Sequence, residues 1–325
     1  MSIFIPFPQQ HHVGGPATFM YNLRTYLDEV KFAYHLNYQA GDHIFFPISH
    51  DLHQLDQIKA DGSKIIQRLD GIYYPSKHGE TYQKLNQDIK KIYQSYADVI
   101  IFQSYYSQQQ CEAMFGPAPA HLTKIIYNGA NQKIFHPRKK IWRLSSKKHF
   151  ISTGNFRNLD MIEPMILACD QLWSQSVNFT LHLVGPIANE QLQPFFQRPY
   201  LKYHGSVDLP VLAKLLSQAD LFIYSHLNPP CPNSVIEALS AGLPVVGFDS
   251  GSMKELCHFS PELLAPVSDE VFQSYQAFNS ELLSAKIKLC LDNLAVYQEK
   301  SLSHAGDYGF EECGRQYIKI FSAID

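Results

Sequence analysis

The sequence predicts an α/β protein built from two doubly wound domains with parallel sheets. In both halves of the chain, short apolar runs rich in β-branched residues alternate with longer helical stretches, the pattern of repeated β-α-β units. Runs such as DVIIF, DLFIY and VVGF lack polar alternation, as expected of strands buried on both faces of a parallel sheet. The length of 325 residues exceeds the ~250–300 residues at which one hydrophobic core stops growing. These observations together favour two domains.

The first half is expected to contain five strands and two longer helices. The strands are Ser2–Pro6, His43–Pro47, Lys64–Leu69, Val99–Phe102 and Lys124–Tyr127. The helices are Ala17–Leu27 and Thr81–Tyr96. The polar, basic, turn-rich segment Asn128–Lys148 then predicts a connection between domains.

The second half repeats this rhythm. Its expected strands are His149–Thr153, Thr180–Val184, Leu221–Tyr224 and Pro244–Phe248. Its expected helices are Glu163–Gln175, Leu209–Gln218, Asn233–Ala241 and Ser252–Leu256, followed by a helical tail from Glu281 with Ser280 as N-cap.

These elements divide the chain into three parts. We expect residues 1–140 to form an N-terminal Rossmann-like domain, residues 141–305 to form a second one, and residues 306–325 to form a helix that packs back on the first domain. Ligands of doubly wound sheets bind outside the carboxyl ends of the strands, here in the cleft that the two domains face.

Composition excludes several classes of protein. A net charge of −3 argues against a nucleic-acid binder that needs a strong basic field. Residues 1–140 carry 14 Lys and Arg against 11 Asp and Glu, whereas the remainder carries 13 against 19. The mildly basic N-terminal half would suit an anionic surface, although ordinary variation between domains explains it equally.

The six cysteines lie at least 23 residues apart, which is neither a disulfide framework nor a zinc site and fits a reducing compartment. The sequence opens without a signal-peptide pattern and has no long apolar run, so we expect a cytoplasmic protein and leave peripheral membrane contact open. No metal site is expected, because the His11-His12 and His50–His53 pairs lack a third ligand at a sensible spacing.

The most informative stretch is residues 219–256. A strand leads into a Pro-rich loop and then into a helix, for which Asn233 is the expected N-cap. The free amides of Ser234 and Val235, together with the helix dipole, favour an anion such as phosphate. Glu237 lies four residues after Asn233, on the same helical face, and could accept hydrogen bonds from a ribose diol.

This stretch, ADLFIYSHLNPPCPNSVIEALSAGLPVVGFDSGSMKEL, closely resembles the donor-site signature of the retaining nucleotide-sugar glycosyltransferases of family 4, which have the GT-B fold. Further matches follow in the family's order: VGGPATFMYNL, ADVIIFQSYYS, IIYNGANQKIFHP, STGNFR, HLVGP and YHGSV. The resemblance covers nearly the whole chain. It implies a GT-B glycosyltransferase with no obligatory metal that uses a UDP- or GDP-linked sugar as co-substrate.

The resemblance also assigns roles to individual residues. Gly14 and Gly15 would let the backbone approach the diphosphate, which Ser234 and Val235 would hold from the other domain. Glu237 would bind the ribose, and the segment from Gly205 to Val207 would lie against the nucleobase. The donor-binding set is thus Gly14, Gly15, Asn155, Arg157, Gly205, Val207, Asn233, Ser234, Val235 and Glu237.

Two departures from the family pattern stand out. The family usually has Gly-Arg near position 155 and a Lys about five residues later, where this chain has Asn155 and then Leu159 or Asp160. Arg157 is the nearby cation that could substitute. The family's carboxylate eight residues before Glu237 is replaced by Pro229, whose side chain makes no hydrogen bond to a sugar.

The acceptor side of the reaction is assigned to residues after the strand Lys64–Leu69. Arg68 and Asp70 form a charged pair at its carboxyl end, and we predict that Asp70 lies near the transferred sugar while Arg68 pairs with it or with a phosphate; a structural ion pair is the alternative. His78, Tyr73 and Tyr74 are weaker acceptor-side candidates.

We therefore predict transfer of a sugar to a saccharide or lipid-linked saccharide acceptor, in surface polysaccharide or lipopolysaccharide synthesis. Two alternatives stay open: a GT-B nucleotide-sugar epimerase, and a non-catalytic protein that binds a sugar nucleotide or a partner. The sequence does not identify the base, the sugar, the acceptor, the linkage or the oligomeric state.

Overall fold

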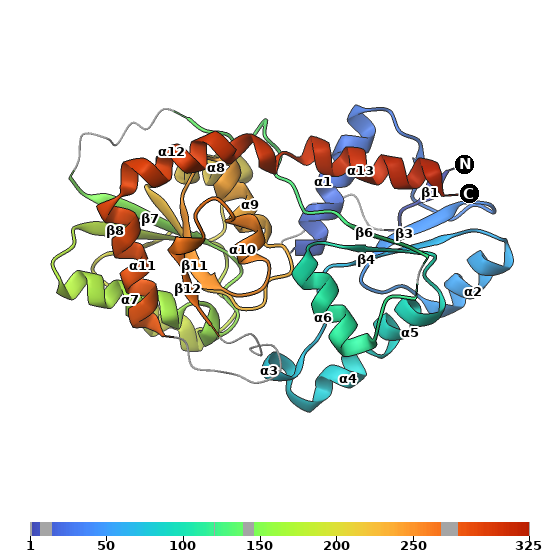
Figure 1. The fold of residues 1–325 in the computed structure, drawn as a ribbon, viewed down its shortest axis with the longest axis horizontal. Coiled ribbons are helices and arrows are strands. Elements are labelled where there is room, and N and C mark those ends of the chain that lie inside the picture. The colour runs from blue at the N-terminus through green and yellow to red at the C-terminus, as the bar shows by residue number, and fades with distance from the viewer. Residues whose placement is uncertain (1, 7–14, 120, 139–145, 268–278, 325) are drawn as a thin grey trace. The chain divides into compact units, whose positions relative to one another are not determined.

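A computed structural model describes residues 2–6, 15–119, 121–138, 146–267 and 279–324, which form two compact α/β units (Figure 1). Unit 1 contains the described residues up to Gly129 and the C-terminal segment from Phe310, and unit 2 contains those from Ala130 to Gly309. The chain thus enters unit 2 about ten residues earlier than the boundary at residue 140 that we expected.

Unit 1 is built on a six-stranded parallel sheet. Its strands are β1 (Ile3–Phe4), β2 (Tyr34–His35), β3 (His43–Pro47), β4 (Ile65–Leu69), β5 (Val99–Phe102) and β6 (Leu122–Ile125). They lie in the order β2-β1-β3-β4-β5-β6, and every pairing is parallel. Strands β3 and β5 have the predicted bounds, whereas the two-residue β2 is too short to leave a signal in the sequence.

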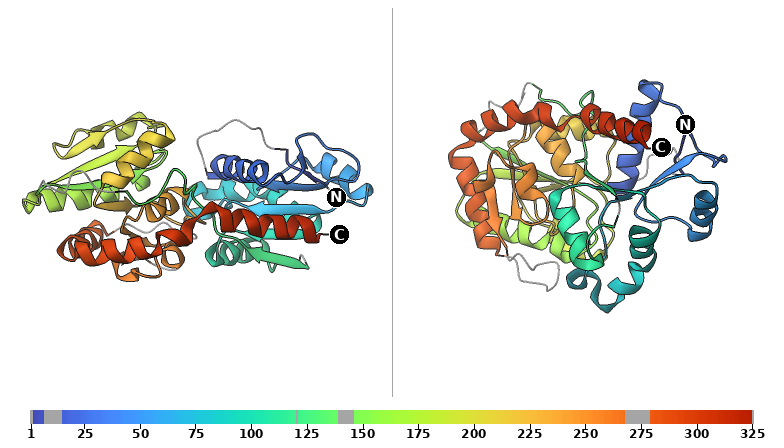
Figure 2. Two further views of the ribbon diagram at one scale, coloured as in Figure 1. Left: turned by 90° about the horizontal axis from the view of Figure 1, so that it is seen from above. Right: turned by 45° about the vertical axis from the view of Figure 1, so that its right-hand side comes forward.

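Helices cover both faces of this sheet. They are α1 (Gly15–Glu29), α2 (Leu52–Ala60), α3 (Pro75–His78), α4 (Tyr82–Leu85), α5 (Gln87–Ser95), α6 (Tyr105–Phe115) and α13 (Phe310–Ala323). Helices α1 and α13 pack on the face that carries Phe45, Ile66 and Ile101 (Figures 1 and 2). Helices α2, α5 and α6 cover the opposite face through two further apolar clusters.

The long helix predicted over Thr81–Tyr96 is wrong, because it is divided at Asn86 into α4 and α5. The Asn86 side chain accepts from the Tyr73 amide at 3.0 Å and donates to the Tyr73 carbonyl at 2.7 Å. An asparagine that satisfies a neighbouring backbone in this way competes with regular helical bonding.

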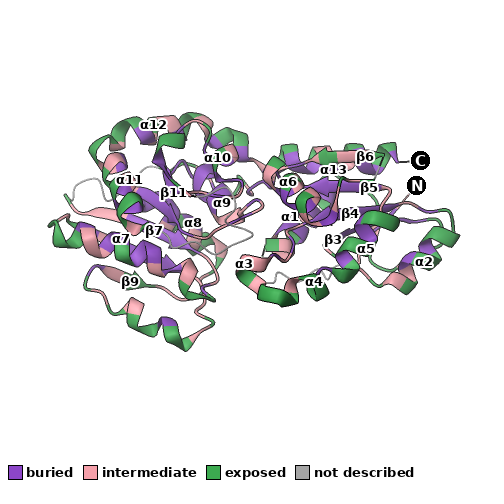
Figure 3. Cartoon of the chain, turned by 60° about the horizontal axis from the view of Figure 1, so that its bottom comes forward, coloured by how far each residue is buried: buried purple, intermediate pink, exposed green. Residues whose placement is uncertain are grey.

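Unit 2 repeats the architecture with a second parallel sheet of six strands. These are β7 (Lys148–Thr153), β8 (Phe179–Val184), β9 (Leu201–Tyr203), β10 (Leu221–Tyr224), β11 (Val245–Asp249) and β12 (Leu264–Pro266). Their order is β12-β11-β10-β7-β8-β9, again parallel throughout. The two sheets are mostly buried, whereas the outer faces of the helices are exposed (Figure 3).

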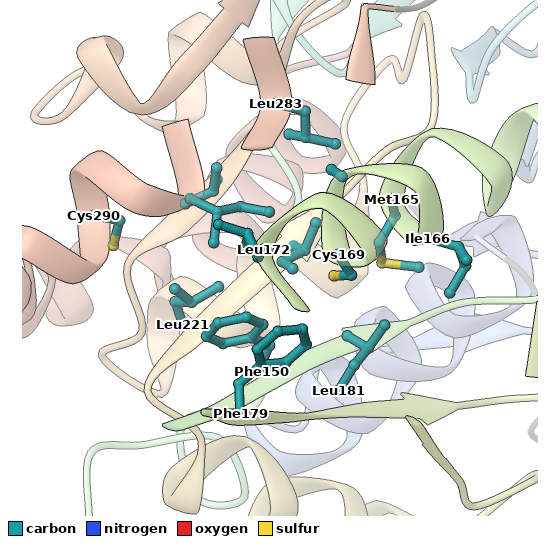
Figure 4. Packing of buried hydrophobic residues seen from close by; sticks show 14 of the residues in the cluster. Phe150, Met165, Ile166, Cys169, Leu172, Phe179, Leu181, Leu221, Leu283 and Cys290 are labelled. Carbon is teal, nitrogen blue, oxygen red and sulfur yellow. The ribbon is translucent and has the colours of Figure 1, made fainter. Parts of the chain in front are cut away.

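The helices of unit 2 are α7 (Glu163–Ser174), α8 (Leu209–Gln218), α9 (Asn233–Ser240), α10 (Met253–Leu256), α11 (Ser280–Asp292) and α12 (Leu294–His304). Helices α7 and α11 close one face of the sheet over a core in which the rings of Phe150 and Phe179 stack at 4.6 Å (Figure 4). The predicted cap of the tail helix is wrong by one residue: Asn279, not Ser280, accepts from the Leu282 amide.

Candidate active site

Each sheet has one point at which the strand order reverses. In unit 1 this point lies between β1 and β3, and in unit 2 it lies between β7 and β10. Ligands of doubly wound sheets bind outside the carboxyl ends of the strands at such points. The loop after β7 carries Asn155 and Arg157, and the loop after β10 leads to the helix that carries Glu237. The topology therefore brings the donor-site candidates of unit 2 to one edge of its sheet.

Direct contacts join the loops at this edge. A Cβ atom added to Gly154 would lie 3.1 Å from the His226 ring, so the loop after β7 passes close to the loop after β10. The Ser225 hydroxyl donates to the Met161 carbonyl at 2.6 Å, which ties the same two segments again. His226 was not among the predicted site residues, because its proximity to Gly154 becomes apparent only from the fold.

Helix α9 begins one residue earlier than an N-cap at Asn233 would imply. Pro232 is its N-cap, with no side-chain capping bond, and Asn233 is its first residue. The Val235 and Ile236 amides both donate to the Pro232 carbonyl, at 3.1 and 3.2 Å. The prediction of a free Val235 amide is thus wrong, because the tight first turn uses it. The Ser234 amide has no acceptor in the described part of the chain and is the donor that the first turn leaves for an anion.

Glu237 lies one turn further along α9 and is partly exposed. Burial raises the pKa of this carboxyl from 4.5 to about 8, and no cation or hydrogen-bond donor of the described residues opposes that rise. A carboxyl group desolvated without a compensating partner is characteristic of functional sites. Hydroxyl groups of a ligand would supply the hydrogen bonds that it lacks.

Asn155 and Arg157 follow β7 at the same edge. The Asn155 Oδ1 atom is buried and has no hydrogen-bond partner, whereas Arg157 is exposed. An unsatisfied buried amide oxygen needs a donor, and a bound ligand or water would provide one. The exposed guanidinium is available to a phosphate. Leu159 and Asp160, the two residues that could stand at the position of the family's usual lysine, lie in a 3-10 turn over Leu159–Met161.

Gly205 and Val207 follow β9. The Gly205 carbonyl accepts from the Gly185 amide at 2.7 Å, so the loops after β8 and β9 are joined. Gly185 has a φ of +126°, and a Cβ atom there would lie 1.9 Å from the Gly154 carbonyl oxygen. Three loops, after β7, β8 and β9, are thereby packed backbone to backbone beside the predicted nucleobase segment.

Pro229, which replaces the family's first carboxylate, has a structural function here. It is buried, its carbonyl accepts from the Ser252 amide at 2.9 Å, and its ring leaves no room for a side chain at Gly251. At this position the chain therefore has a residue that packs the loop, instead of a side chain that forms hydrogen bonds.

Three histidines form a hydrogen-bonded row across β7, β8 and the residue after β9. His149 Nδ1 lies 3.0 Å from His182 Nε2, and His182 Nδ1 lies 2.9 Å from His204 Nε2. Each such contact joins one N–H to one bare ring nitrogen. Burial first, then the neighbouring histidines and Lys202, lower the pKa of His182 from 6.5 to about 4.

This row predicts a loss of stability in acid. His182 takes up a proton more readily in the unfolded chain, so its contribution is complete above pH 6.5 and disappears as the pH falls towards 4. We expect His182→Gln to flatten this part of the stability profile, which amounts to at most about 3 kcal/mol. Urea unfolding at pH 4.5, 5.5 and 7 measures it; a difference between variant and wild type that stays constant with pH would contradict the assignment.

In unit 1, Gly15 is the first residue of α1, at the carboxyl edge of the sheet, and a Cβ atom there would meet nothing within 4 Å. Gly14 lies outside the described residues. The loop that the sequence analysis assigned to the diphosphate is thus represented in the structure by Gly15 alone.

Arg68 and Asp70 form the expected ion pair, and both side chains are buried. The Arg68 guanidinium lies over the Phe19 ring at 3.4 Å, and its Nε donates to the Tyr317 hydroxyl at 2.9 Å. Arg68 is therefore enclosed by unit 1 and has no exposed surface for a phosphate. Asp70 stands at the carboxyl end of β4, with its Oδ2 atom buried and without a hydrogen-bond partner.

The other acceptor-side candidates form one aromatic cluster. The His78 ring packs edge-on against Tyr73 at 5.0 Å and against Tyr74 at 5.3 Å. Burial, the largest cause, lowers the pKa of His78 below its usual 6.5. The structure thus brings together the three residues that sequence analysis named separately.

Two wider searches of the described residues gave negative findings. No group of three or more His, Cys, Asp or Glu side chains in the described ranges is arranged to hold a metal ion. None of the described helices combines the length and the apolar character that a membrane crossing requires.

Comparison with known proteins gives one family match, in the part of the chain that forms unit 2. Residues 147–279 match the model of the family described as Glycosyl transferases group 1. This segment contains every donor-binding candidate of unit 2. A search of curated proteins gave no significant match to the sequence.

Several solved structures of other proteins are similar to this chain over almost its whole length. A sucrose-phosphate synthase from Thermosynechococcus elongatus matches with a TM-score of 0.71 and 15% identity, over 99% of this chain and 100% of that one. WaaG, a glycosyltransferase involved in lipopolysaccharide biosynthesis, matches with a TM-score of 0.69 and 11% identity, over 99% of both chains. The pneumococcal O-GlcNAc transferase GtfA, solved with UDP and GlcNAc, matches with a TM-score of 0.61 and 12% identity, over 93% of this chain and 59% of that one.

These likenesses agree with the two parallel six-stranded sheets described above. The chain therefore has the fold of the GT-B glycosyltransferases, and the segment that carries its unit 2 site matches the glycosyl transferases group 1 family.

Proposed function

We propose that this protein is a retaining glycosyltransferase of family 4 that moves a sugar from a nucleoside-diphosphate sugar to a saccharide or lipid-linked saccharide. One observation carries the proposal. At the switch point of unit 2, an open helix N-terminus, an exposed arginine and an uncompensated carboxyl group follow adjacent strands, within the segment that matches the family.

The chemistry requires stabilisation of a leaving group. The bond between the anomeric carbon and the diphosphate breaks, a bond to the acceptor oxygen forms, and the acceptor hydroxyl loses its proton. Negative charge therefore grows on the diphosphate. The Ser234 amide, the dipole of α9 and the Arg157 guanidinium are the groups that meet this charge. Arg157 takes the place of the Arg and Lys usual in the family.

Glu237 is proposed to bind the ribose. A diol donates two hydrogen bonds to a carboxylate, and the Glu237 carboxyl has no other donor among the described residues. The segment Gly205–Val207 is proposed to lie against the nucleobase, and Asn155 to contact the donor through its unsatisfied amide oxygen.

Unit 1 is proposed to serve the sugar and its acceptor. Asp70 would accept a hydroxyl through its unsatisfied oxygen, with Arg68 as its buried counter-charge, and the cluster of Tyr73, Tyr74 and His78 would contact a saccharide. Gly14 and Gly15 would let the backbone approach the phosphates. The proposed pathway is surface polysaccharide or lipopolysaccharide synthesis at the cytoplasmic face of the membrane, without an obligatory metal.

The first test is thermal stabilisation of the protein by UDP, GDP, ADP, CMP and their common sugar conjugates. A ligand at 100 times its Kd adds about 2.7 kcal/mol to the free energy of unfolding. We expect one nucleoside diphosphate and its sugar conjugate to stabilise the protein.

The second test is the variant Arg157→Gln. It should weaken binding of the nucleoside diphosphate about 10-fold and leave binding of the bare nucleoside unchanged, because a charge-assisted bond to phosphate contributes about 1.5–3 kcal/mol. If no member of the panel binds, the enzyme assignment fails, and a non-catalytic protein that keeps the fold becomes the better explanation of Pro229 and Asp160.

A further inference from the structure

A polar network surrounds the Asp70 carboxylate in the interior of unit 1. The Gln103 side chain donates to the Leu69 carbonyl at 3.1 Å and to Asp70 Oδ1 at 3.3 Å. The Asn128 side chain in turn donates to the Gln103 amide oxygen at 3.1 Å. Gln103, Asn128 and Arg68 are all buried, so these bonds are shielded from water.

Arg68 closes this network from the other side. Its guanidinium donates to Asn128 Oδ1 and pairs with Asp70, so Asn128 bonds to Arg68 through its oxygen and to Gln103 through its nitrogen. Its Nε donates to the hydroxyl of Tyr317 on α13. A residue 249 positions along the chain thus completes the shell around the Arg68–Asp70 pair.

One atom of this network stands out because it lacks a donor. Asp70 Oδ1 receives Gln103 and faces Arg68, whereas Oδ2 is buried without any hydrogen-bond partner. An unsatisfied carboxylate oxygen in the interior is costly, and native proteins keep one where a ligand or water completes it. The Asp70 side chain is only 3% exposed, so the network, not solvent, determines where Oδ2 points.

We infer that Gln103, Asn128 and Tyr317 are positioning residues, which hold the Arg68–Asp70 pair so that Asp70 Oδ2 accepts a hydrogen bond from a saccharide hydroxyl. This inference rests on the proposed function and gives roles to three residues to which the family resemblance assigns none. A fixed carboxylate lowers the entropic cost of orienting a hydroxyl at the reacting centre, and small displacements of such a group reduce turnover strongly.

Tyr317→Phe tests the inference, with Tyr93→Phe as the matched control. Each variant removes one buried phenol hydroxyl from unit 1: Tyr317 bonds to Arg68, whereas Tyr93 bonds to the Gly116 carbonyl at 2.9 Å, in a different cluster. The assay measures release of nucleoside diphosphate from UDP-glucose, UDP-galactose, UDP-N-acetylglucosamine and GDP-mannose, with water and with octyl glycosides as acceptors. Thermal unfolding of every variant is measured alongside.

We expect Tyr317→Phe to lower kcat on the order of 10-fold and to leave the KM for the sugar nucleotide unchanged. Tyr93→Phe should lower the unfolding temperature without lowering kcat. In the background of Asp70→Asn, which itself reduces kcat, Tyr317→Phe should cause no further loss, because both changes act on one group. Gln103→Met provides the same comparison should Tyr317→Phe fail to fold.

Equal kcat values for Tyr317→Phe and Tyr93→Phe would overturn the inference, as would a full additional loss in the Asp70→Asn background. The inference alone is contradicted if the wild-type protein binds a sugar nucleotide and releases its diphosphate while these variants behave like the control. A wild-type protein that releases no diphosphate from any donor contradicts the proposed function, and the inference with it.

Discussion

Gly185→Ala is expected to destabilise unit 2 by about 4 kcal/mol or more and to abolish nucleotide binding. The added methyl group would lie 1.9 Å from the Gly154 carbonyl oxygen, and a φ of +126° is a conformation that L side chains rarely adopt. The obstacle is backbone, which cannot rotate away as a side chain would. The Gly154 amide donates to the Val184 carbonyl at 3.0 Å, so both the amide and the carbonyl of Gly154 lie against the segment Val184–Gly185.

Gly62→Ala is the control for this prediction. Gly62 also has a positive φ, +75°, but a Cβ atom there would meet nothing within 4 Å, and it lies outside the candidate site. We expect conformational strain alone, about 1–2 kcal/mol, with nucleotide binding retained. Urea unfolding and thermal shifts with the ligand selected by the panel measure both effects. Similar losses in the two variants would show that the close approach to Gly154 is not what makes Gly185 necessary.

Glu237→Gln is expected to have opposite effects on stability and on binding. The folded-state pKa of Glu237, about 8, lies above the unfolded value of 4.5, so the folded state holds the proton more tightly. The contribution to stability is therefore complete below pH 4.5 and is lost as the pH rises towards 8. Glutamine carries no charge to desolvate, and we expect it to stabilise the protein at pH 8.5 by on the order of 3 kcal/mol, with little change at pH 4.5.

The same variant should bind the nucleoside diphosphate at least 10-fold more weakly, because an amide offers the ribose diol one uncharged acceptor oxygen whereas a carboxylate offers two. The control is the exposed Glu299→Gln, which should alter neither property. Unfolding curves at several pH values and calorimetric titration with the nucleotide decide the matter. Weaker binding without the pH-dependent gain in stability would mean that Glu237 is not desolvated in the folded protein.

Much of the fold could be predicted because its signals are local. Continuous apolar runs gave β5 and β10 to the residue, and the bounds of α8 followed from its amphipathic period. The errors fall where a distant residue competes with a local preference. Asn86 divides a helix by binding Tyr73, and Pro232 replaces Asn233 as the cap because its carbonyl receives the first-turn amides.

The candidate site shows the same division. A motif within one strand, loop and helix pointed to Glu237 and Ser234. Among the described residues, the Glu237 carboxyl has no counter-charge and the Ser234 amide has no acceptor. The shell around Asp70 could not be predicted in this way. Gln103, Asn128 and Tyr317 come from three separate elements, and their bonds to Asp70 and Arg68 depend on strand order and on the placement of α13.

The position of α13 has a consequence for synthesis of the chain on the ribosome. Phe19 and Phe45 pack against Tyr317, whose hydroxyl also receives Arg68, yet Tyr317 is translated only after all of unit 2. Until α13 emerges from the ribosome, one apolar face of unit 1 is uncovered, and Arg68 lacks its hydrogen-bond acceptor Tyr317. Unit 2, which is complete in the chain at Gly309, can fold before α13 has been synthesised. The first half of the gene product is therefore the last to become native, and this interval is when it most needs protection from aggregation.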